Sequence, residues 1–477
     1  MINIKNYING KFVNSNSQLK SYNPATSEHI ANLPNSSNSE LQDAIKSANS
    51  ILPDWSMMGD RRRSSYLLRI ADDIENNINK FIESETLDSG KPIKKSKNVE
   101  IPRAIENLRF FSSIIRGHKT ASYRMEGAGY NYVVRNPLGV VACISPWNLP
   151  LYLLTWKIAP ALVTGNCVIA KPSEITPLTA FLLSKSCKNA GLPPGVLNII
   201  HGEGQKIGKM IVENKDIKAI SFTGGTETGK YISNNSQPFT KLSLEMGGKN
   251  PVIIFQDCNY HKMLDTTIRS SFYNQGQICL AGSRIYVQDE IYDKFKKDFV
   301  NRVKKLKVGD PFSENTDQGP VISKSHMTKI LSYISKAVDD GGNILVGGNQ
   351  VNLDSKFKKG NFVEPTVIEF LNQKSIVQQD EIFGPVVTLN KFKSTSEVIK
   401  LANDSEYGLA SIIWTQDINK ANRISDQLDC GIVWVNAWLL RDLRTPFGGM
   451  KKSGFGREGG YDAIDFFTEQ KNICIGY

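Results

Sequence analysis

The stretch AISFTGGTETG, residues 219–229, joins a short apolar run to a double-glycine turn. Its first four residues predict a buried strand, and a helix is expected after Gly229. Gly224 and Gly225 lie between the two, where backbone N–H groups can point at a phosphate. A tight turn without a ligand is the alternative interpretation. The stretch predicts one β–α unit of a larger sheet.

The same alternation of strand and helix continues on both sides of this unit. Strands are predicted at residues 140–144, 167–170, 196–200, 219–222 and 241–244, and helices at 153–162, 177–190 and 205–213. This spacing is typical of a parallel, doubly wound α/β sheet. Such sheets bind nucleotides at the carboxyl ends of their strands.

A second α/β unit is expected from Pro251 onward. Helices are predicted there at 292–303 and 326–339, and strands at 386–389, 408–414 and 431–436. The chain has 477 residues, which is too long for one core, so two or three domains are expected. Near the N-terminus we expect a hairpin at 7–13, helices at 61–85 and 99–116, and a projecting hairpin at 120–134.

The composition excludes several classes of protein. Apolar residues make up 40% and charged residues 22%, as in ordinary globular proteins, and no apolar run is long enough to span a membrane. Seven scattered cysteines and a polar N-terminus predict a cytoplasmic location. No Cys/His cluster has metal-ligand spacing, so no metal is expected. The net charge of +11 is spread along the chain, which favours a solvated surface over nucleic-acid binding.

One cysteine has unusual neighbours. Cys279 lies in FYNQGQICLAGS, residues 272–283, among polar residues and glycines. Core cysteines normally have apolar neighbours, so a nucleophile that is kept as a thiolate is the sharper interpretation. A structural cysteine is the alternative.

Other polar residues follow predicted strands. Glu245 precedes a double glycine, and Asn148 lies in PWNLP after the first strand. A carboxylate can activate water and a carboxamide can stabilise an oxyanion, although a helix cap and a turn residue are the alternatives. Lys171 and Glu174 follow the second strand, where a carboxylate can hold ribose hydroxyls and repel the 2′-phosphate of NADP.

Together these motifs carry a family resemblance. The chain contains PWNLP (146–150), KPSE (171–174), FTGGTETG (222–229), LEMGGK (244–249), NQGQIC (274–279), EIFGP (381–385) and PFGG (446–449). In order and spacing it resembles the NAD(P)-dependent aldehyde dehydrogenase superfamily over nearly its whole length. The resemblance implies a Rossmann-type doubly wound NAD domain (1–117 and 138–247), a second α/β catalytic domain (248–464) and a small β oligomerisation flap (118–137 and 465–477). It also implies a homodimer or homotetramer.

The resemblance assigns catalytic roles to five residues. Cys279 matches the nucleophile, Glu245 the general base and Asn148 the side-chain half of the oxyanion hole. Lys157 and Glu458 match a proton-relay pair behind the base. The implied reaction passes through a thiohemiacetal and a thioester on the cysteine, and releases an acid.

The resemblance also implies a cofactor site, with NAD expected in preference to NADP because of Glu174. Gly225 stands where the family commonly has serine, so a hydroxyl contact to the pyrophosphate is lost. The expected cofactor-binding residues are Trp147, Lys171, Ser173, Glu174, Gly204, Gly208, Phe222, Gly224, Gly225, Thr226, Glu381 and Phe383.

Two arginines predict the substrate class. Arg441 and Arg103 match tunnel positions that are commonly aromatic or apolar, and a guanidinium pairs with a carboxylate. Both motifs resemble the branch of 2-hydroxymuconate and 2-aminomuconate semialdehyde dehydrogenases, which implies a carboxylate-bearing semialdehyde. The other expected substrate-binding residues are Leu149, Trp156, Ile278 and Leu280.

Three alternatives remain open at this point. The arginines could form structural salt bridges with Asp442 and Glu106. The substrate could be a long apolar aldehyde of the retinal type, or the enzyme could accept many aldehydes. The chain could also be a catalytically silent, structural family member.

Overall fold

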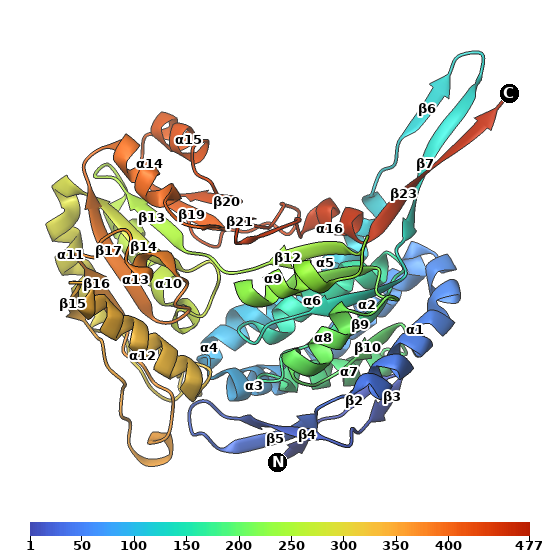
Figure 1. Ribbon diagram of the computed structural model, residues 1–477, viewed down its shortest axis with the longest axis horizontal. Helices are drawn as coiled ribbons and strands as arrows, with labels where there is room; N and C mark the ends of the chain where they lie inside the picture. The colour runs from blue at the N-terminus through green and yellow to red at the C-terminus, as the bar shows by residue number, and fades with distance from the viewer.

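Two large β-sheets organise the computed structural model, which describes residues 1–477 (Figure 1). The first sheet has the strand order β22-β12-β11-β8-β9-β10-β2-β3. Its central strands run parallel and are β12 (Lys241–Glu245), β11 (Ala219–Thr223), β8 (Val140–Ile144), β9 (Cys167–Lys171) and β10 (Leu197–Ile199). The strand predictions for this part of the chain are therefore confirmed.

Short antiparallel strands close this sheet at both edges. On one side β2 (Asn6–Ile8) pairs with β10 and forms a hairpin with β3 (Lys11–Val13). Its turn residues Asn9 and Gly10 have φ values of 50° and 71°, which a two-residue hairpin turn requires. On the other side β22 (Gly454–Phe455) pairs with β12.

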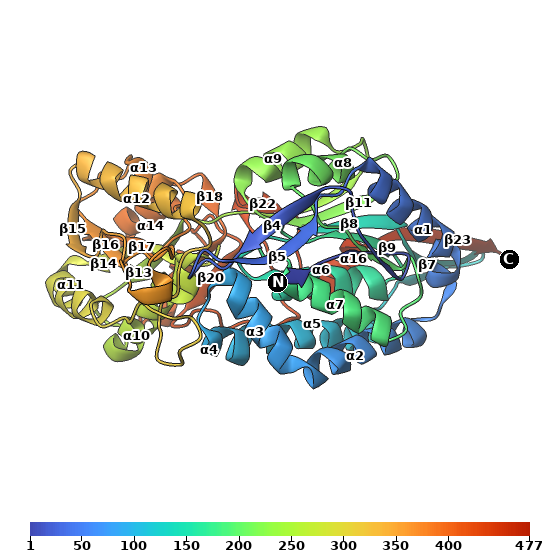
Figure 2. The ribbon, with the colours of Figure 1, turned by 90° about the horizontal axis from the view of Figure 1, so that it is seen from below.

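Helices cover both faces of the first sheet (Figure 2). The central helix, α6 (Pro150–Val163), is buried at every position, which explains why most of its residues are apolar, with Thr155 and Lys157 as the main exceptions. The others are α1 (Asn38–Met57), α2 (Asp60–Asn76), α3 (Ile78–Ser89), α4 (Ile93–Lys95), α5 (Ile101–Ile114), α7 (Leu178–Asn189), α8 (Lys209–Val212), α9 (Thr226–Asn235) and α16 (Gly460–Phe466). A π-helical turn at Ser96–Glu100 leads into α5, and another at Gly204–Gly208 leads into α8.

Two helix predictions need correction. The single helix expected at 61–85 is divided, because Asn77 leaves helical geometry at φ −111° and ψ 19°. The Asn77 side chain donates to the carbonyl of Asp73 at 2.9 Å and so ends α2. The helix expected after Gly229 begins earlier, at Thr226, so only Gly224 and Gly225 form the turn.

The second sheet has the order β15-β16-β17-β14-β13-β19-β20 and is parallel except for β15. Its strands are β13 (Asn250–Ile254), β14 (Gly282–Gln288), β15 (Asn343–Val346), β16 (Thr366–Glu369), β17 (Val386–Phe392), β19 (Ala410–Trp414) and β20 (Ile432–Val435). Around it lie α10 (Tyr260–Phe272), α11 (Asp289–Val303), α12 (Lys324–Asp339), α13 (Ile376–Gln379), α14 (Thr395–Asn403) and α15 (Ile418–Ser425). The predicted second α/β unit is thus present.

A three-stranded antiparallel sheet projects from the body of the molecule (Figure 1). It consists of β6 (Ser122–Met125), β7 (Gly129–Pro137) and the C-terminal β23 (Thr468–Gly476). Two smaller sheets hold β1 (Ile2–Asn3), β4 (Gln18–Tyr22) and β5 (His29–Pro34), and β18 (Tyr407–Gly408) with β21 (Met450–Lys451). We propose the expected division into two domains and a flap, although β22 crosses it by pairing with the first sheet.

None of the helices is both long enough and apolar enough to cross a membrane.

The buried side chain of Asn166 connects the first sheet to the base of the flap. It accepts from the N–H of Gly139 at 3.0 Å and donates to the carbonyl of Phe467 at 2.8 Å. Asn166→Ala leaves both groups without a partner, so we expect a loss of about 1–3 kcal/mol in stability. Denaturant unfolding followed by circular dichroism measures it. The exposed Asn189→Ala is the control, and equal midpoints for the two variants would contradict the prediction.

Candidate active site

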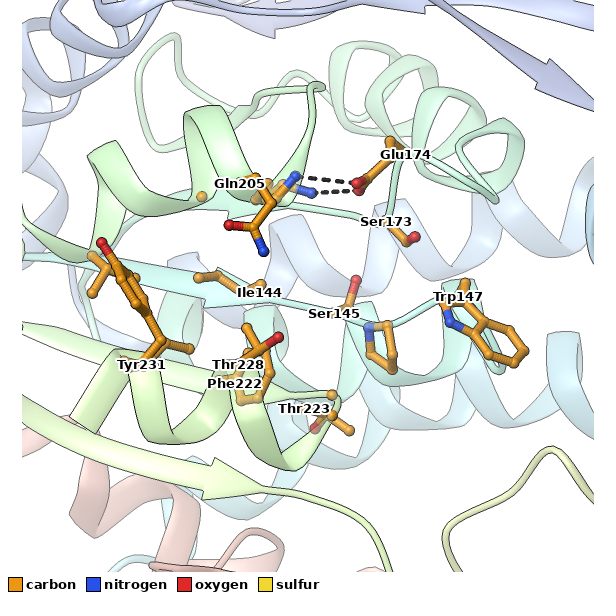
Figure 3. A pocket seen from close by; sticks show the side chains of 18 of the residues that line it. Ile144, Ser145, Trp147, Ser173, Glu174, Gln205, Phe222, Thr223, Thr228 and Tyr231 are labelled. Carbon is orange, nitrogen blue, oxygen red and sulfur yellow. Dashed lines mark hydrogen bonds and ion pairs between the residues drawn. The ribbon is translucent and has the colours of Figure 1, made fainter. Parts of the chain in front are cut away.

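A cavity of about 490 Å³ lies at the carboxyl ends of β8, β9 and β11 (Figure 3). It is lined by nine of the expected cofactor residues: Trp147, Lys171, Ser173, Glu174, Gly204, Gly208, Phe222, Gly224 and Gly225. Thr226 does not line this cavity, and its hydroxyl lies 3.3 Å from that of Tyr407. Gln205, Thr228 and Tyr231 also line the cavity and were not expected.

Glu174 holds an ionised carboxylate at one end of this cavity. Its oxygens accept from Lys171 Nζ at 2.9 Å and from the N–H of Gly204 at 3.1 Å (Figure 3). Burial by itself would raise the pKa of Glu174, but Lys171 and the backbone donors outweigh burial and lower it. A fixed negative charge therefore lies where the sequence predicts a contact with ribose hydroxyls.

The turn between β11 and α9 offers backbone donors to the same cavity. Gly225 is the residue before α9 and provides no side-chain cap for the first turn of that helix. A Cβ on Gly225 would meet no atom within 4 Å, whereas one on Gly224 would lie 2.4 Å from the ring of Phe222. Uncapped N–H groups at a helix N-terminus favour an anionic group.

A second cavity, of about 250 Å³, shares Trp147, Gly224 and Gly225 with the first. Its other walls include Asn148, Cys279, Glu381 and Phe383. Residues from both sheets, up to 237 positions apart in the chain, therefore meet in one continuous site.

His326 and Lys329 of α12 also line this second cavity and were missed from the sequence. His326 Nε2 lies 2.7 Å from the carbonyl oxygen of Phe383, and its ring packs against Trp147. Burial, with the nearby Lys329, lowers the pKa of His326 to about 4, so the ring is neutral at pH 7 and Nε2 donates to the carbonyl. A single histidine in a predicted helix does not indicate from the sequence that its side chain lines a cavity.

The segment before Cys279 is bent into a left-handed turn. Asn274, Gln275 and Gly276 have φ values of 50°, 55° and 68°, which cost a non-glycine residue about 1–3 kcal/mol each. A Cβ on Gly276 would lie 2.0 Å from the carbonyl oxygen of Gly384, so only glycine fits there. This turn follows α10 of the second unit and leads the chain to Cys279, which lines the second cavity.

The surroundings of Cys279 favour a neutral thiol. Burial raises the pKa of Cys279 to about 12, and Glu381 and Glu245 add to this effect, whereas Arg441 opposes it. The expected standing thiolate is thus not supported by the electrostatics of the protein alone. Deprotonation requires a base or an additional positive charge beside the sulfur.

Glu245, at the end of β12, is a buried carboxyl group with no hydrogen-bond partner from the protein. Burial and the neighbouring Glu458 raise its pKa well above the usual range, although Lys157 and Arg441 oppose them. A carboxylate with a raised pKa accepts protons readily near neutral pH. Glu245 is therefore suited to take a proton from a thiol or a water.

Lys157 and Glu458 form a buried pair next to this carboxyl group. Lys157 Nζ lies 2.5 Å from Glu458 Oε1 and 3.2 Å from Ser221 Oγ, and the Ser221 hydroxyl donates to Glu458 at 3.0 Å. The two residues predicted to act as a pair are in contact, and Ser221 is an additional member of the group.

Asn148 lines the second cavity. One Nδ2–H donates to the carbonyl of Gln277 at 3.0 Å, which fixes the plane of the amide and leaves the other N–H available. This geometry is compatible with the oxyanion-hole role that we propose for Asn148.

The guanidinium of Arg441 is held between aromatic rings and lacks an acidic partner. It lies 4.0 Å from the ring centroid of Phe447 and 4.7 Å from that of Trp156, and Nη1 donates to the hydroxyl of Tyr152 at 2.8 Å. Its Nη2 is buried without a hydrogen bond. The salt bridge to Asp442, one alternative from the sequence, is made by Arg444 instead. Tyr152 was not expected at this site.

Arg103 lies further out, on α5. Its Nη1 contacts Glu106 at 2.7 Å, as the alternative interpretation predicts. Arg103 and Arg441 both line an open cavity of about 710 Å³. The apolar candidates Leu149, Ile278 and Leu280 are buried in the core of the second unit, together with Tyr152 and Phe447, and Trp156 is buried in that of the first.

The raised pKa of Cys279 predicts a steep dependence of its reactivity on pH. Only the thiolate attacks iodoacetamide, and the thiolate fraction rises about tenfold per pH unit below the pKa. We expect the alkylation rate of the cofactor-free protein to increase in this way from pH 7 to pH 10. Mass spectrometry of the Cys279 peptide measures it, with Cys279→Ser as the control. A plateau below pH 9 would contradict the prediction.

Comparisons with known proteins agree with this geometry. The family model described as "Aldehyde dehydrogenase family" matches residues 12–473. The chain is 45% identical to 2-aminomuconic semialdehyde dehydrogenase of Bos taurus, covering 100% of this chain and 98% of that protein. It is 42% identical to 2-hydroxymuconic semialdehyde dehydrogenase of Pseudomonas sp. (strain CF600), covering 100% of both.

Solved structures show the same similarity. A putative aldehyde dehydrogenase from Burkholderia cenocepacia superposes with a TM-score of 0.97 at 36% identity, covering 100% of this chain and 98% of that one. Betaine aldehyde dehydrogenase from Staphylococcus aureus, solved in complex with NAD+, gives 0.95 at 37% identity, covering 98% and 94%. The chain belongs to the aldehyde dehydrogenase family.

Proposed function

We propose that this protein oxidises a carboxylate-bearing semialdehyde to the corresponding acid, with NAD+ as the hydride acceptor. The observation that carries the proposal is the single cavity in which Cys279 and Asn148 meet. That cavity continues into the larger one at the strand ends, which offers backbone donors and a carboxylate. The semialdehyde dehydrogenases to which the chain is similar support the same substrate class.

The larger cavity fits a dinucleotide. Gly224 and Gly225 would hold the pyrophosphate with backbone N–H groups, and Lys171 and Glu174 would hold the adenosine ribose. Glu381 and Phe383 would hold the nicotinamide end beside Cys279. When bound, NAD+ supplies a hydride acceptor and a positive charge near the thiol.

The reaction then follows from Cys279 and Asn148, which line the second cavity, and from Glu245, the residue before Met246 in its wall. Glu245 takes the thiol proton, and the sulfur of Cys279 adds to the aldehyde carbon. Asn148 and the backbone N–H of Cys279 stabilise the alkoxide, at about 2.7–4 kcal/mol per donor. Loss of hydride from this thiohemiacetal leaves a thioester on Cys279. Glu245 first passes the thiol proton on through Lys157 and Glu458, and the carboxylate that this restores activates the water that cleaves the thioester.

The preference for NAD rests on Glu174. The carboxylate accepts hydrogen bonds from ribose hydroxyls, but it repels the 2′-phosphate of NADP. We expect Glu174→Gln to lower the ratio of kcat/KM for NAD over that for NADP by about tenfold, because about 1.4 kcal/mol of repulsion is removed. Steady-state kinetics with both cofactors measures the ratio. Glu203→Gln, in the adjacent loop, is the matched control, and an unchanged ratio in Glu174→Gln would contradict this role.

The substrate class rests on Arg441. Arg441 is half-buried, and its buried Nη2 has no hydrogen-bond partner, so an anion from the substrate is its natural counterpart. The aromatic rings of Trp156 and Phe447 hold it in place while Nη2 remains available. Arg103 is already paired with Glu106, so we assign it the outer and weaker contact.

Removal of this cation tests the substrate class. We expect Arg441→Met to lower kcat/KM for succinic semialdehyde about 100-fold, or by about 2.8 kcal/mol, since loss of one partner of a desolvated charge pair costs about 2–5 kcal/mol. The value for butanal, an uncharged aldehyde of equal length, should change only a few-fold. Arg444→Met removes an exposed arginine that is paired with Asp442, and should leave the ratio unchanged. Equal losses for both aldehydes would favour an enzyme for uncharged substrates.

We also propose a homo-oligomer, either a dimer or a tetramer. The projecting sheet of β6, β7 and β23 exposes Tyr123, Tyr130 and Ile475 on its surface. Exposed apolar side chains on an unsupported sheet favour coverage by another subunit.

The seven cysteines are all free, which supports a cytoplasmic location.

A further inference from the structure

The main-chain carbonyl of Asn148 is held by two buried side chains. Lys91 Nζ donates to it at 3.0 Å, and Asn274 Nδ2 donates at 3.2 Å. Asn148 lines the second cavity, and its carboxamide donates to the carbonyl of Gln277. The backbone that carries this amide is therefore fixed by a cation from one segment and an amide from another.

The ammonium group of Lys91 is buried, so water does not stabilise its charge. Its side chain is 1% exposed, and it follows α3 after Gly90, which has a φ of 71°. Nζ also donates to Glu85 at 3.0 Å and lies 4.0 Å from Glu100. Burial alone would lower the pKa of Lys91, but these carboxyl groups outweigh it and raise the pKa, so the ammonium persists. Removing two charges from water costs free energy, and replacing a buried ion pair by apolar residues often leaves stability unchanged or raises it. Stability alone therefore does not explain a buried lysine at this position.

The same group of residues holds the nucleophile segment. Tyr273, directly before the left-handed turn, donates its hydroxyl to Glu100 at 3.2 Å. Asn274 donates to the carbonyl of Gln277 at 3.1 Å, the same oxygen that accepts from the Asn148 carboxamide. Both halves of the proposed oxyanion hole are therefore tied to the segment around α3 and α4, which faces the second unit (Figures 1 and 2).

We propose that Lys91, assisted by Asn274, is a positioning residue for the oxyanion hole. The inference rests on the proposed function, but it does not depend on which aldehyde is the substrate. The ammonium acts through the carbonyl of Asn148 and fixes the direction of the carboxamide relative to the backbone N–H of Cys279. A displacement of about 1 Å at such a site can cost about 100-fold in rate.

The test must separate positioning from simple stabilisation. Lys91→Met alone would leave Glu85 as an unpaired buried charge, so the useful variant is Lys91→Met with Glu85→Gln. Glu85→Gln alone keeps the donor to Asn148 and is the partner control. Lys94→Met removes a half-buried lysine of the same segment that is paired with Asp317.

The readouts are the pre-steady-state burst of NADH, the KM for the aldehyde and the alkylation of Cys279 by iodoacetamide. We expect the double variant to slow the burst about 10-fold to 100-fold, while KM changes less than about twofold. Alkylation does not form an oxyanion, so its rate should stay the same. Glu85→Gln and Lys94→Met should retain a normal burst.

Two results would overturn the role of Lys91. One is a normal burst in the double variant; the other is an equal loss in burst and alkylation, because then the residue places the sulfur or stabilises the fold. If the double variant does not fold, Asn274→Gly tests the same carbonyl, since glycine accepts the φ of 50°. A normal burst there would equally contradict the inference. A wild-type protein without any burst would instead contradict the proposed function.

A double-mutant cycle gives a further check. Asn148→Ala removes the carboxamide through which Lys91 is proposed to act. In that background the double variant should cause little additional loss of burst rate, because both changes affect one interaction. Additive losses would show that Lys91 acts elsewhere.

Discussion

The close approach of Gly276 to the carbonyl of Gly384 is the contact on which the site depends. A side chain at position 276 would lie 2.0 Å from that oxygen, so the two loops can pack only through glycine. This contact places Cys279 next to Glu381 and Phe383 from the neighbouring loop. The strain of the left-handed turn is offset by Gln275, which donates to the carbonyl of Pro320 at 2.8 Å. Local backbone strain therefore determines where the sulfur lies.

Secondary structure was easiest to predict from the sequence where every residue of a segment is buried. Residues 140–144 and 167–171 are buried at every position, and such parallel strands appear as continuous apolar runs. It was hardest to predict at helix ends, because Asn77 interrupts a regular apolar pattern with a single side-chain hydrogen bond. The early start of α9 at Thr226 likewise depends on turn geometry that apolar periodicity does not report.

The residues of the sequence motifs could be predicted as site residues, whereas the residues that contact and orient them could not. Cys279, Glu245 and Asn148 follow strands or glycines, where a polar side chain is conspicuous. Tyr152, His326 and Lys91 are not conspicuous, because their partners lie far away in the chain: Lys91 and the Asn148 carbonyl are 57 positions apart, and Tyr152 and Arg441 are 289 apart. Only tertiary packing brings these pairs together, within the first unit for Lys91 and between the two units for Tyr152 and Arg441. The neutral state of the Cys279 thiol has the same origin, since burial and distant carboxyl groups raise its pKa.

The charges of the site indicate what it is built to receive. Burial raises the pKa of Glu245, of Glu381 and of Cys279, so the protein alone disfavours negative charge at each of them. The guanidinium of Arg441 has no acidic partner, although its charge lowers the pKa of Cys279 and of Glu245, and α9 adds uncapped N–H groups. Three places therefore offer hydrogen-bond donors or a positive charge without an anion beside them: the turn after β11, the Asn148 carboxamide and Arg441. A pyrophosphate, a developing alkoxide and a substrate carboxylate would each supply the missing negative charge at one of them, and together they describe a dinucleotide-dependent oxidation of an anionic aldehyde.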